Sequence, residues 1–329
     1  MRRVFVAALV GTFVAAGAVL GAAFEAARAA EYPSRPVTIV VGFPPGGPSD
    51  TLARIIAGKL SDLLGQPFVV DNHPGAGGNV AGALVAHAEP DGYTLLMGNN
   101  AILATNASLY AKIDYDPRKD FAPISLIGTQ ANILVVNPDV PVHSLAELIA
   151  FAKANPGKLN FASSGYGLAA HLAGELFKTD AQIDIVHVPY KGAAPALQDV
   201  ISGQDQMMFA TTTAVAGFIR SGQVRPLAVT TLKRTALLPD VPTIDELGLH
   251  GFEATTWHGL VAPAGTPKYI IDTLHGAVAA ALRDPDMRKT LAAQGVDIVG
   301  DTPDEFAAYI KAEIPKWDAV IKASGAKLE

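Results

Sequence analysis

The sequence contains no cysteine among its 329 residues, and this absence excludes several kinds of chemistry at once. Disulfides, thiolate catalysis and cysteine-ligated metals all need the thiol group. The eight histidines form no HExxH motif or i,i+4 pair, and there is no G-x-S-x-G turn, so the usual zinc-protease and serine-hydrolase signatures are missing too. We therefore predict no metal, no cofactor and no catalytic residue.

Runs of basic residues are also missing. Lys and Arg number 25 against 31 Asp and Glu, which gives a formal net charge of −6. An acidic chain without a Lys/Arg cluster lacks the electrostatic footprint of a protein that binds nucleic acid or anionic lipid. We expect neither as a partner.

The N-terminus has the three parts of a secretory signal peptide. Arg2 and Arg3 precede an Ala/Val/Gly-rich apolar run, and Ala27-Arg28-Ala29 is a small-x-small cleavage site. The alternative is a membrane anchor, since the run is nearly long enough to span a bilayer. We predict cleavage of residues 1–29, which removes three arginines and one glutamate and moves the net charge from −6 to −8. No later stretch is long and apolar enough to span, so we expect a soluble mature protein.

The remaining chain has the length of two domains. A β-branched run, Val37–Val41, is typical of a buried parallel strand, and glycine loops and helical patterns alternate with further strands up to Met97. Ser49 or Asp50 is expected to cap the helix that begins near residue 49. Repeated strand, glycine loop and helix predict a parallel α/β sheet.

The pattern restarts near residue 130. Strands are predicted at 132–136, 159–162, 183–188, 207–209 and 227–230, with Ser144 and Glu147 forming a capping box on the helix that follows the first of these. The segment 251–263 is predicted to return to the first unit, followed by helices to about 283 and from 303 to about 323. We expect lobe 1 at 30–129 and 250–329, lobe 2 at 130–249, and a two-strand hinge between them.

The glycine loops between strands and helices point to an anion. A helix N-terminus presents unpaired backbone N–H groups and partial positive charge, so it can hold an anion without Arg or Lys. Each helix end contributes only about 0.3 to 2 kcal/mol, whereas micromolar affinity needs about 8 kcal/mol. Several loops must therefore converge. From pattern alone, Pro44-Pro45-Gly46-Gly47 is equally consistent with a simple tight turn.

One glycine loop nearly matches the dinucleotide fingerprint G-x-G-x-x-G/A, at Gly165–Ala170. A single match is weak, and the acidic residue that should end the next strand is not evident. We do not favour a nucleotide site.

An ordered set of motifs resembles a known family. The motifs are YPSRPV at 32–37, FPPGG at 43–47, PGAGG at 74–78, DGYT at 91–94, SSG at 163–165, VPYKG at 188–192, LPDVPT at 238–243 and APAGTP at 262–267. Together they resemble the Bug-type solute receptors of tripartite tricarboxylate transporters.

The resemblance implies a fold, a function and partners. The fold would be an α/β, two-lobed periplasmic binding protein (Venus flytrap, type II-like). The function would be non-enzymatic: a periplasmic monomer binds a small organic carboxylate between its lobes, a di- or tricarboxylate or an aromatic acid, and delivers it to a membrane permease.

The resemblance also implies which residues contact the ligand. The first lobe would offer Phe43, Gly46, Gly47, Ser49, Gly77, Gly78, Asn99 and Asn100. The second lobe would offer Ser163, Ser164, Gly165, His171, Tyr190, Lys191 and Thr211.

The chain departs from the family pattern at one place. Members often carry Asp-Asn after the Met-Phe strand, whereas Phe209 is followed here by Ala210 and Thr211. A carboxylate that could pair with a ligand ammonium is missing, so we hypothesise a ligand without an amino group.

Two alternatives stay open. One is an enzyme on the same fold, with His171 or Lys191 as the catalyst, although no nucleophile–base pair is evident in the sequence. The other is a sensor whose loaded form docks on a signalling protein instead of a permease.

Overall fold

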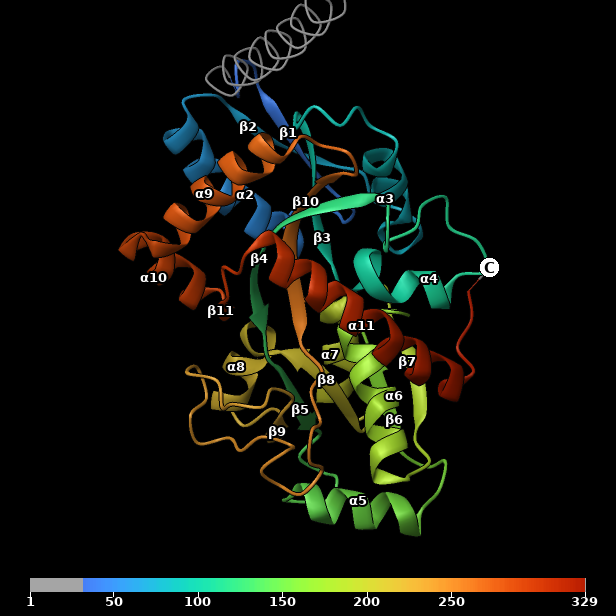
Figure 1. The fold of residues 1–329 in the computed structure, drawn as a ribbon. Helices are drawn as coiled ribbons and strands as arrows, with labels where there is room; N and C mark the ends of the chain where they lie inside the picture. The colour runs from blue at the N-terminus through green and yellow to red at the C-terminus, as the bar shows by residue number, and fades with distance from the viewer. Residues whose placement is uncertain (1–31, 329) are drawn as a thin grey trace, which may run out of the picture.

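The computed structural model describes residues 32–328, which form two β-sheets with helices packed on them (Figure 1). The predicted signal peptide lies outside the described residues. No helix in the described range is long and apolar enough to cross a membrane. The predicted α/β class is confirmed.

The first sheet has six strands in the order β11-β4-β10-β3-β1-β2. Their bounds are β1 Val37–Val41, β2 Phe68–Asn72, β3 Thr94–Asn99, β4 Phe121–Gln130, β10 Thr256–Pro263 and β11 Val296–Ile298. Strands β1, β2 and β3 are parallel, whereas β10 runs antiparallel to both of its neighbours, β3 and β4. The run Val37–Val41 is an inner strand, as its composition predicts.

The second sheet has five strands in the order β7-β6-β8-β5-β9. Their bounds are β5 Asn132–Val136, β6 Asn160–Ser163, β7 Val186–Pro189, β8 Met207–Thr211 and β9 Arg225–Val229. Strands β6, β7 and β8 are parallel, and β5 runs antiparallel to β8 and β9. We call the parts of the chain built on the six-stranded and five-stranded sheets the first and second lobe.

Helices cover both sheets. Their bounds are α2 Pro48–Leu64, α3 Asn79–Ala86, α4 Asn106–Leu109, α5 Leu145–Ala154, α6 Ala169–Ala181, α7 Ala193–Ile201, α8 Thr212–Arg220, α9 Lys268–Arg283, α10 Pro285–Ala293 and α11 Pro303–Ser324. A 3₁₀ turn at Ala76–Gly78 precedes α3, and a π-helical turn at Ala101–Thr105 precedes α4.

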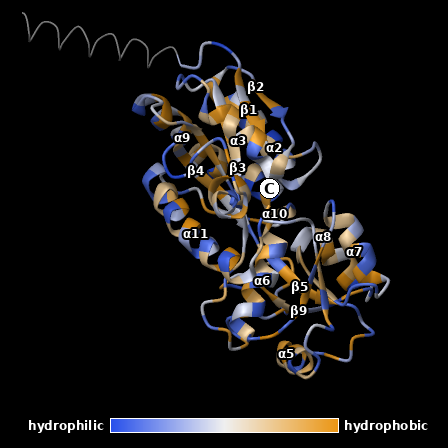
Figure 2. Cartoon of the chain, turned by 90° about the vertical axis from the view of Figure 1, so that its right-hand side faces the viewer, coloured by the Kyte–Doolittle hydropathy of each residue, from blue (hydrophilic) through white to orange (hydrophobic). Residues whose placement is uncertain are grey.

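Successive side chains of β1 point to opposite faces of the sheet and belong to two different hydrophobic cores. Ile39 and Val41 belong to a buried cluster with Leu52 of α2 and Leu274 of α9. Val40 points to the opposite face, as neighbouring strand residues must, and belongs to a cluster that contains residues of α3 and α11. In Figure 2 the hydrophobic colour follows the strands, while α11 carries much of the hydrophilic colour.

The chain passes between the sheets twice. β4 ends at Gln130 and β5 begins at Asn132, so Ala131 alone separates the two sheets there. The return runs from the end of β9 at Val229 to the start of β10 at Thr256. The sheets therefore change at the two predicted crossovers, while the lobe boundaries proposed from the sequence stay a prediction.

The connectivity brings together the two sheet edges at which the parallel strands of each sheet end. β4 runs parallel to β3, because both are antiparallel to β10, so Gln130 lies at the edge where β1, β2 and β3 also end. β5 is antiparallel to β8, so Asn132 lies at the edge where β6, β7 and β8 end. One residue joins these edges, so the strand-to-helix loops of the two lobes lie on either side of the crossovers.

Helix α11 belongs to both lobes by its contacts. It packs on β4 of the first lobe and on α6 of the second, and Figure 1 shows it running alongside both. Its Glu313 is buried and accepts hydrogen bonds from the indole nitrogens of Trp257 (3.0 Å) and Trp317 (2.7 Å). The C-terminal helix is thereby tied to β10, the strand that returns from the second lobe.

Two capping predictions are wrong in part. α2 begins after Gly47, with Pro48 in its first turn, so neither Ser49 nor Asp50 is its N-cap. Pro at the first helical position has the φ angle that a helix start needs. Ser144 does cap α5 by accepting from the Glu147 amide, but the Glu147 carboxylate accepts from His143 rather than from Ser144, so the capping box is incomplete.

Candidate functional site

Five helices start at the two facing edges. In the first lobe these are α2 after β1 and α3 after β2; in the second they are α6, α7 and α8 after β6, β7 and β8. In none of the five does the N-cap side chain hydrogen-bond the first turn. The first-turn amides of a helix have no intrahelical partner, so five sets of donors lie near the crossovers.

Three other helices differ. α5, α10 and α11 are capped by the side chains of Ser144, Asp284 and Thr302. α5 and α11 begin at the opposite ends of their sheets, because β5 and β11 run antiparallel to their neighbours β8 and β4. α9 also starts at the opposite end of the first sheet and has no side-chain cap. Missing side-chain caps are thus shared by these five helices. The helical turn that follows β3 at the same edge differs, because the Asn99 side chain accepts a hydrogen bond from the Ile102 amide of its first turn.

Asp50 holds the first glycine loop in place from the first turn of α2. Its buried carboxylate accepts hydrogen bonds from the Gly46 amide (2.8 Å) and from the side chains of Arg54 and Asn72 (both 3.0 Å). Burial pushes the pKa of Asp50 up, but the hydrogen bonds from Arg54, Gly46 and Asn72 outweigh it and lower the pKa below its usual value. The positive charge of Arg54 is therefore balanced by Asp50 of the same lobe.

Ser49 lies beside Asp50 and contacts the returning strand. Its hydroxyl is 2.8 Å from Nε2 of His258 on β10, and both side chains are buried. Sequence reasoning singled out Ser49 but assigned His258 no specific partner. The two residues are 209 positions apart, and no motif links them.

The second loop of the first lobe depends on glycine. Gly77 and Gly78 have φ angles of +63° and +94°. Residues other than glycine rarely adopt positive φ angles. A Cβ on Gly78 would lie 2.7 Å from Ile102, and one on Gly77 would lie 2.8 Å from the Tyr110 hydroxyl. The backbone therefore approaches its neighbours too closely for any side chain.

Asn99 ends β3 and Asn100 follows it at the same edge, and both are buried. Asn99 accepts from the Ile102 amide (3.3 Å). Asn100 donates to the Thr255 carbonyl (2.9 Å) and accepts from the Trp257 amide (2.9 Å), so its side chain brackets the chain where β10 begins. Asn100 thus supports the second crossover with both side-chain polar atoms.

In the second lobe, two imidazoles support the loop after β6. His171 stacks on His187 with ring centroids 4.2 Å apart, and its Nδ1 accepts from the Gly167 amide (3.1 Å). Burial first, then His187 and Lys178, lower the pKa of His171 to about 3. Its Nε2 lies 3.9 Å from the buried carboxylate of Glu175. The ring is thus packed within the second lobe, and the catalytic role suggested for His171 stays an alternative.

Ser163 is engaged in the same loop. Its hydroxyl is 2.6 Å from Nε2 of His187 and 3.2 Å from the Gly165 amide. Gly165 has a φ of +138°. Ser163, Gly165, His171 and His187 therefore form a connected support beneath residues 164–168, and the contact of Ser163 and His171 with a ligand stays a prediction.

The loop after β7 carries Tyr190 and Lys191. The Tyr190 hydroxyl contacts the carboxylates of Asp199 (2.6 Å) and Asp205 (2.7 Å), and burial together with these hydrogen bonds raises the pKa of Tyr190. Its hydroxyl is thus held by the second lobe itself. Lys191 is exposed and is the single Lys or Arg in the five strand-to-helix loops.

Two predicted hydroxyls, those of Thr211 and Ser164, form no such contacts with residues 32–328. Thr211 is the N-cap of α8 but does not cap it. Ser164 uses its backbone carbonyl to accept from the Gly192 amide (3.1 Å), and both residues are partly buried. Both hydroxyls lie in strand-to-helix loops of the second lobe.

The two lobes touch beside these loops. Thr105, in the π-helical turn of the first lobe, donates to the Gly167 carbonyl of the second (3.2 Å), and Gly167 packs against Leu109. The structure thus places the predicted residues of the first lobe at the facing edge of the first sheet. It places those of the second lobe at the facing edge of the second sheet. The contact of these residues with a ligand stays a prediction.

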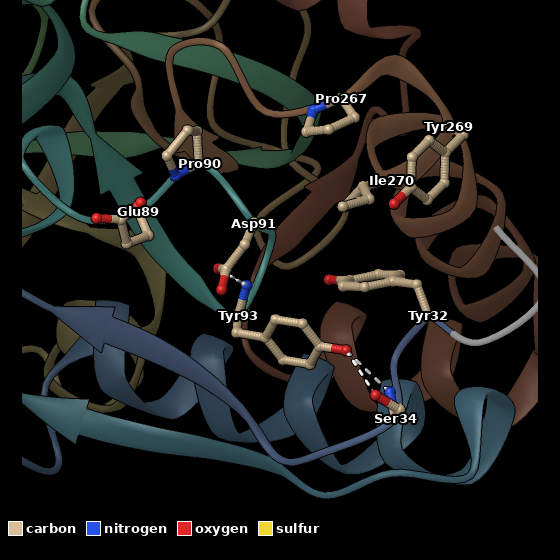
Figure 3. Close-up of a pocket in the computed structure, with 9 residues that line it drawn as sticks. All are labelled: Tyr32, Ser34, Glu89, Pro90, Asp91, Tyr93, Pro267, Tyr269 and Ile270. Atoms are coloured by element: carbon tan, nitrogen blue, oxygen red, sulfur yellow. Dashed lines mark hydrogen bonds between the residues drawn. The ribbon is translucent and has the colours of Figure 1, made fainter. Parts of the chain in front are cut away.

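A separate cavity of about 410 Å³ lies at the opposite end of the first sheet (Figure 3). It is lined by Tyr32, Ser34, Glu89, Pro90, Asp91, Tyr93, Pro267, Tyr269 and Ile270. None of these residues is in the predicted site. In the described range, no group of three or more His, Asp or Glu side chains is arranged to hold a metal ion.

Comparisons with known proteins agree with this architecture. The sequence model of the family described as "Tripartite tricarboxylate transporter family receptor" matches residues 52–326. The solved structure of R. palustris Rpa4515 with adipate is 41% identical, with a TM-score of 0.81, over 90% of this chain and all of that one. The periplasmic binding protein BugD is 37% identical, with a TM-score of 0.78, over 91% of this chain and all of that one. MatC from Rhodopseudomonas palustris with bound malate is 35% identical, with a TM-score of 0.77, over 88% of this chain and all of that one.

Two sheets joined by two crossovers, with open helix ends along their facing edges, define a two-lobed periplasmic binding protein, as in BugD. The chain belongs to the TctC family of tripartite tricarboxylate transporter receptors and is of the Bug type. The resemblance inferred from the motifs is confirmed.

Proposed function

We propose that the protein is a periplasmic receptor that binds a small dicarboxylate between its lobes and delivers it to a membrane permease. The observation that carries this proposal is the set of five uncapped helix N-termini at the two facing edges. Adipate and malate, both dicarboxylates, are bound by two of the similar proteins.

The distribution of these helix ends favours two carboxylates. α2 and α3 lie in the first lobe, and α6, α7 and α8 lie in the second. Each end supplies about 0.3 to 2 kcal/mol for an anion, and hydroxyls such as those of Ser164 and Thr211 add hydrogen bonds of about 1.5 to 3 kcal/mol each to a charged acceptor. Together these terms reach the 8 kcal/mol or so of a micromolar ligand.

The charges around the loops argue against an amino acid. Asp50 is the buried carboxylate nearest the first glycine loop, and it is already paired with Arg54. Ala210, directly after Phe209, stands where the family resemblance leads one to expect an aspartate. A ligand ammonium would therefore lose its hydration without gaining a carboxylate partner.

Binding at both lobes would pull them together. Ala131 and the segment before Thr256 are the two connections about which the lobes can rotate. A ligand drives closure only as far as it binds the closed form better than the open one. A dicarboxylate that bridges the lobes satisfies this condition, and the permease would then recognise the closed form.

Calorimetry on the mature chain tests the proposal. We expect adipate or malate to bind and to raise the melting temperature, and glutamate and aspartate to bind at least about tenfold more weakly. Tight binding of an amino acid and of no plain dicarboxylate would overturn the proposal. Loss of growth on the ligand in a deletion strain would support delivery to a permease rather than sensing.

A further inference from the structure

The N-terminus of α2 has two amides left for an anion. Pro48 has no N–H group, and the Thr51 amide donates to the Gly47 carbonyl (2.9 Å). Within residues 32–328, the amides of Ser49 and Asp50 donate to no protein acceptor. A carboxylate bound at this helix end would therefore lie against the backbone of Asp50, a residue that carries a buried carboxylate of its own.

The side chain of Asp50 is fully used within the first lobe. Its Oδ2 accepts hydrogen bonds from the Gly46 amide (2.8 Å) and from Nε of Arg54 (3.0 Å). Its Oδ1 accepts from Nη2 of Arg54 (2.8 Å) and from Nδ2 of Asn72 (3.0 Å). Two hydrogen bonds on each oxygen occupy the acceptor positions of a carboxylate. Asp50 therefore has no acceptor left for a ligand, and what a ligand meets is its negative charge.

That charge opposes the binding of a second carboxylate. Although burial raises the pKa of Asp50, the hydrogen bonds from Arg54, Gly46 and Asn72 lower it further, so the side chain is ionised at neutral pH. The free amides and the dipole of one helix end favour a negative charge from either source. Because the side chain of Asp50 is only 4% exposed, water screens little of its repulsion of a ligand anion.

Arg54 removes this conflict. It lies one turn further along α2, and its guanidinium binds both oxygens of Asp50 in the two-pronged geometry of the strongest ion pairs. Nη2 of Arg54 also donates to Oδ1 of Asn72 (3.0 Å), whose own amide donates to the Phe43 carbonyl (3.0 Å). The ion pair is thus fixed both to the end of β2 and to the first glycine loop.

We propose that Arg54 is a positioning residue for the ligand: by pairing with Asp50, it keeps the N-terminus of α2 open to a carboxylate without contacting the ligand itself. The side chain of Arg54 is 53% exposed, so the protein neutralises Asp50 without burying a second charge. The inference rests on the proposed carboxylate site between the lobes.

Calorimetry with adipate and malate on the full mature protein tests the role of this charge. Arg54→Gln leaves Asp50 unpaired and should weaken binding by at least about tenfold. Arg54→Lys keeps the charge and should recover part of the loss. The Asp50→Asn/Arg54→Gln double variant has neither charge and should bind at least about threefold more tightly than Arg54→Gln.

Arg35→Gln is the matched control. Arg35 forms an ion pair with Asp91 (2.9 Å) at the opposite end of the first sheet, so its replacement removes a similar pair from the same lobe. It should bind adipate and malate as the wild type does.

The double variant separates charge from structure. If Arg54 served only to hold the loop, or if it bound the ligand directly, neutralising Asp50 would not restore affinity. A double variant that binds no better than Arg54→Gln therefore overturns the inference, as does unchanged affinity in Arg54→Gln. Melting curves verify that each variant is folded. If Arg54→Gln does not fold, the double variant decides: the inference requires it to bind within about tenfold of the wild type.

These outcomes also separate the inference from the function. If the wild type binds dicarboxylates but the variants do not follow the expected order, the inference is wrong and the receptor function stands. If the wild type binds no carboxylate, both fail.

Discussion

The side chain of Asn132 donates a hydrogen bond to the backbone carbonyl of Ala254, 3.1 Å away and 122 residues further along the chain. Asn132 begins the strand that follows the first crossover, and Ala254 lies in the second. This contact ties together the two segments about which the lobes must rotate.

Replacing Asn132 tests the importance of this tie. Asn132 is 1% exposed, and its loss removes one of the two side-chain hydrogen bonds that the Ala254 carbonyl accepts, the other coming from Thr230. We therefore expect Asn132→Ala to lower the free energy of unfolding by about 0.5 to 1.5 kcal/mol. Urea denaturation measures the change. Asn155→Ala, at the C-terminal end of α5, is the control. An equal loss of unfolding free energy in both variants would show that the crossover contact stabilises the protein no more than an ordinary helix-end contact.

Gly47→Val should block the N-terminus of α2. Gly47 has a φ of −78°, so valine is tolerated by the backbone, and its Cβ would lie 3.4 Å from the Pro44 carbonyl. The branched side chain would cover the first-turn amides, and we expect dicarboxylate affinity to fall at least about tenfold while the protein stays folded. Calorimetry and a melting curve measure both effects.

Gly58→Val on the same helix is the matched control, because a Cβ at Gly58 meets nothing within 4 Å. It should bind normally. Unchanged affinity in Gly47→Val would mean that α2 does not contribute to the site.

Ser164→Ala probes the second lobe. Ser163, its neighbour, is held by His187, whereas within residues 32–328 the Ser164 hydroxyl forms no hydrogen bond. We therefore expect Ser164→Ala to leave stability within about 0.5 kcal/mol of the wild type and to weaken dicarboxylate binding by about three- to tenfold. Ser221→Ala, on an exposed turn after α8, is the control. A loss of stability without a loss of affinity would assign Ser164 a structural role.

Two buried histidines, His171 and His258, and the partly buried His187 make stability depend on pH. Burial lowers the pKa of His258 and of His187 to about 4, and burial, His187 and Lys178 lower that of His171 to about 3. In the unfolded chain each titrates near 6.5. Between roughly pH 6.5 and 4 the unfolded state therefore binds more protons, so the free energy of unfolding falls as the pH is lowered. The loss is about 2 kcal/mol by pH 5 for each of the two buried histidines and smaller for the partly exposed His187.

Urea denaturation at pH 7.5, 6 and 5 measures this slope. His187→Gln should flatten it, whereas His250→Gln, at a side chain that is 83% exposed, should not. Buried carboxyls such as Glu175, whose pKa is raised by burial, act in the opposite sense, so the comparison between the two variants isolates the histidine. Parallel slopes in all three proteins would contradict the assignment.

Much of the fold is visible in the sequence because its strongest patterns are local. Val37–Val41 and Asn132–Val136 are predicted at their observed bounds, since continuous β-branched or aliphatic runs between turn residues have few other readings. β4 was not predicted, because Pro123, Ser125 and Gly128 interrupt its apolar pattern. α8 was not predicted either, because it begins in a run of threonines, which have low helix propensity.

The candidate site is visible only in outline. Glycine loops after strands mark the facing edges, but the sequence cannot show which polar side chains the protein uses itself. Asn100 brackets the second crossover, and the hydroxyls of Ser163 and Tyr190 are held by His187 and by two aspartates. Each of these pairings joins residues whose proximity depends on tertiary packing, so sequence spacing contains no signal for it.

A crystal structure of the mature protein with a bound dicarboxylate tests the central claim most directly. The account predicts one carboxylate hydrogen-bonded to first-turn amides of α2 or α3 and the other to those of α6, α7 or α8, with hydroxyls completing each group. A ligand held elsewhere, or one whose charge is balanced by an arginine or a metal ion, would contradict it.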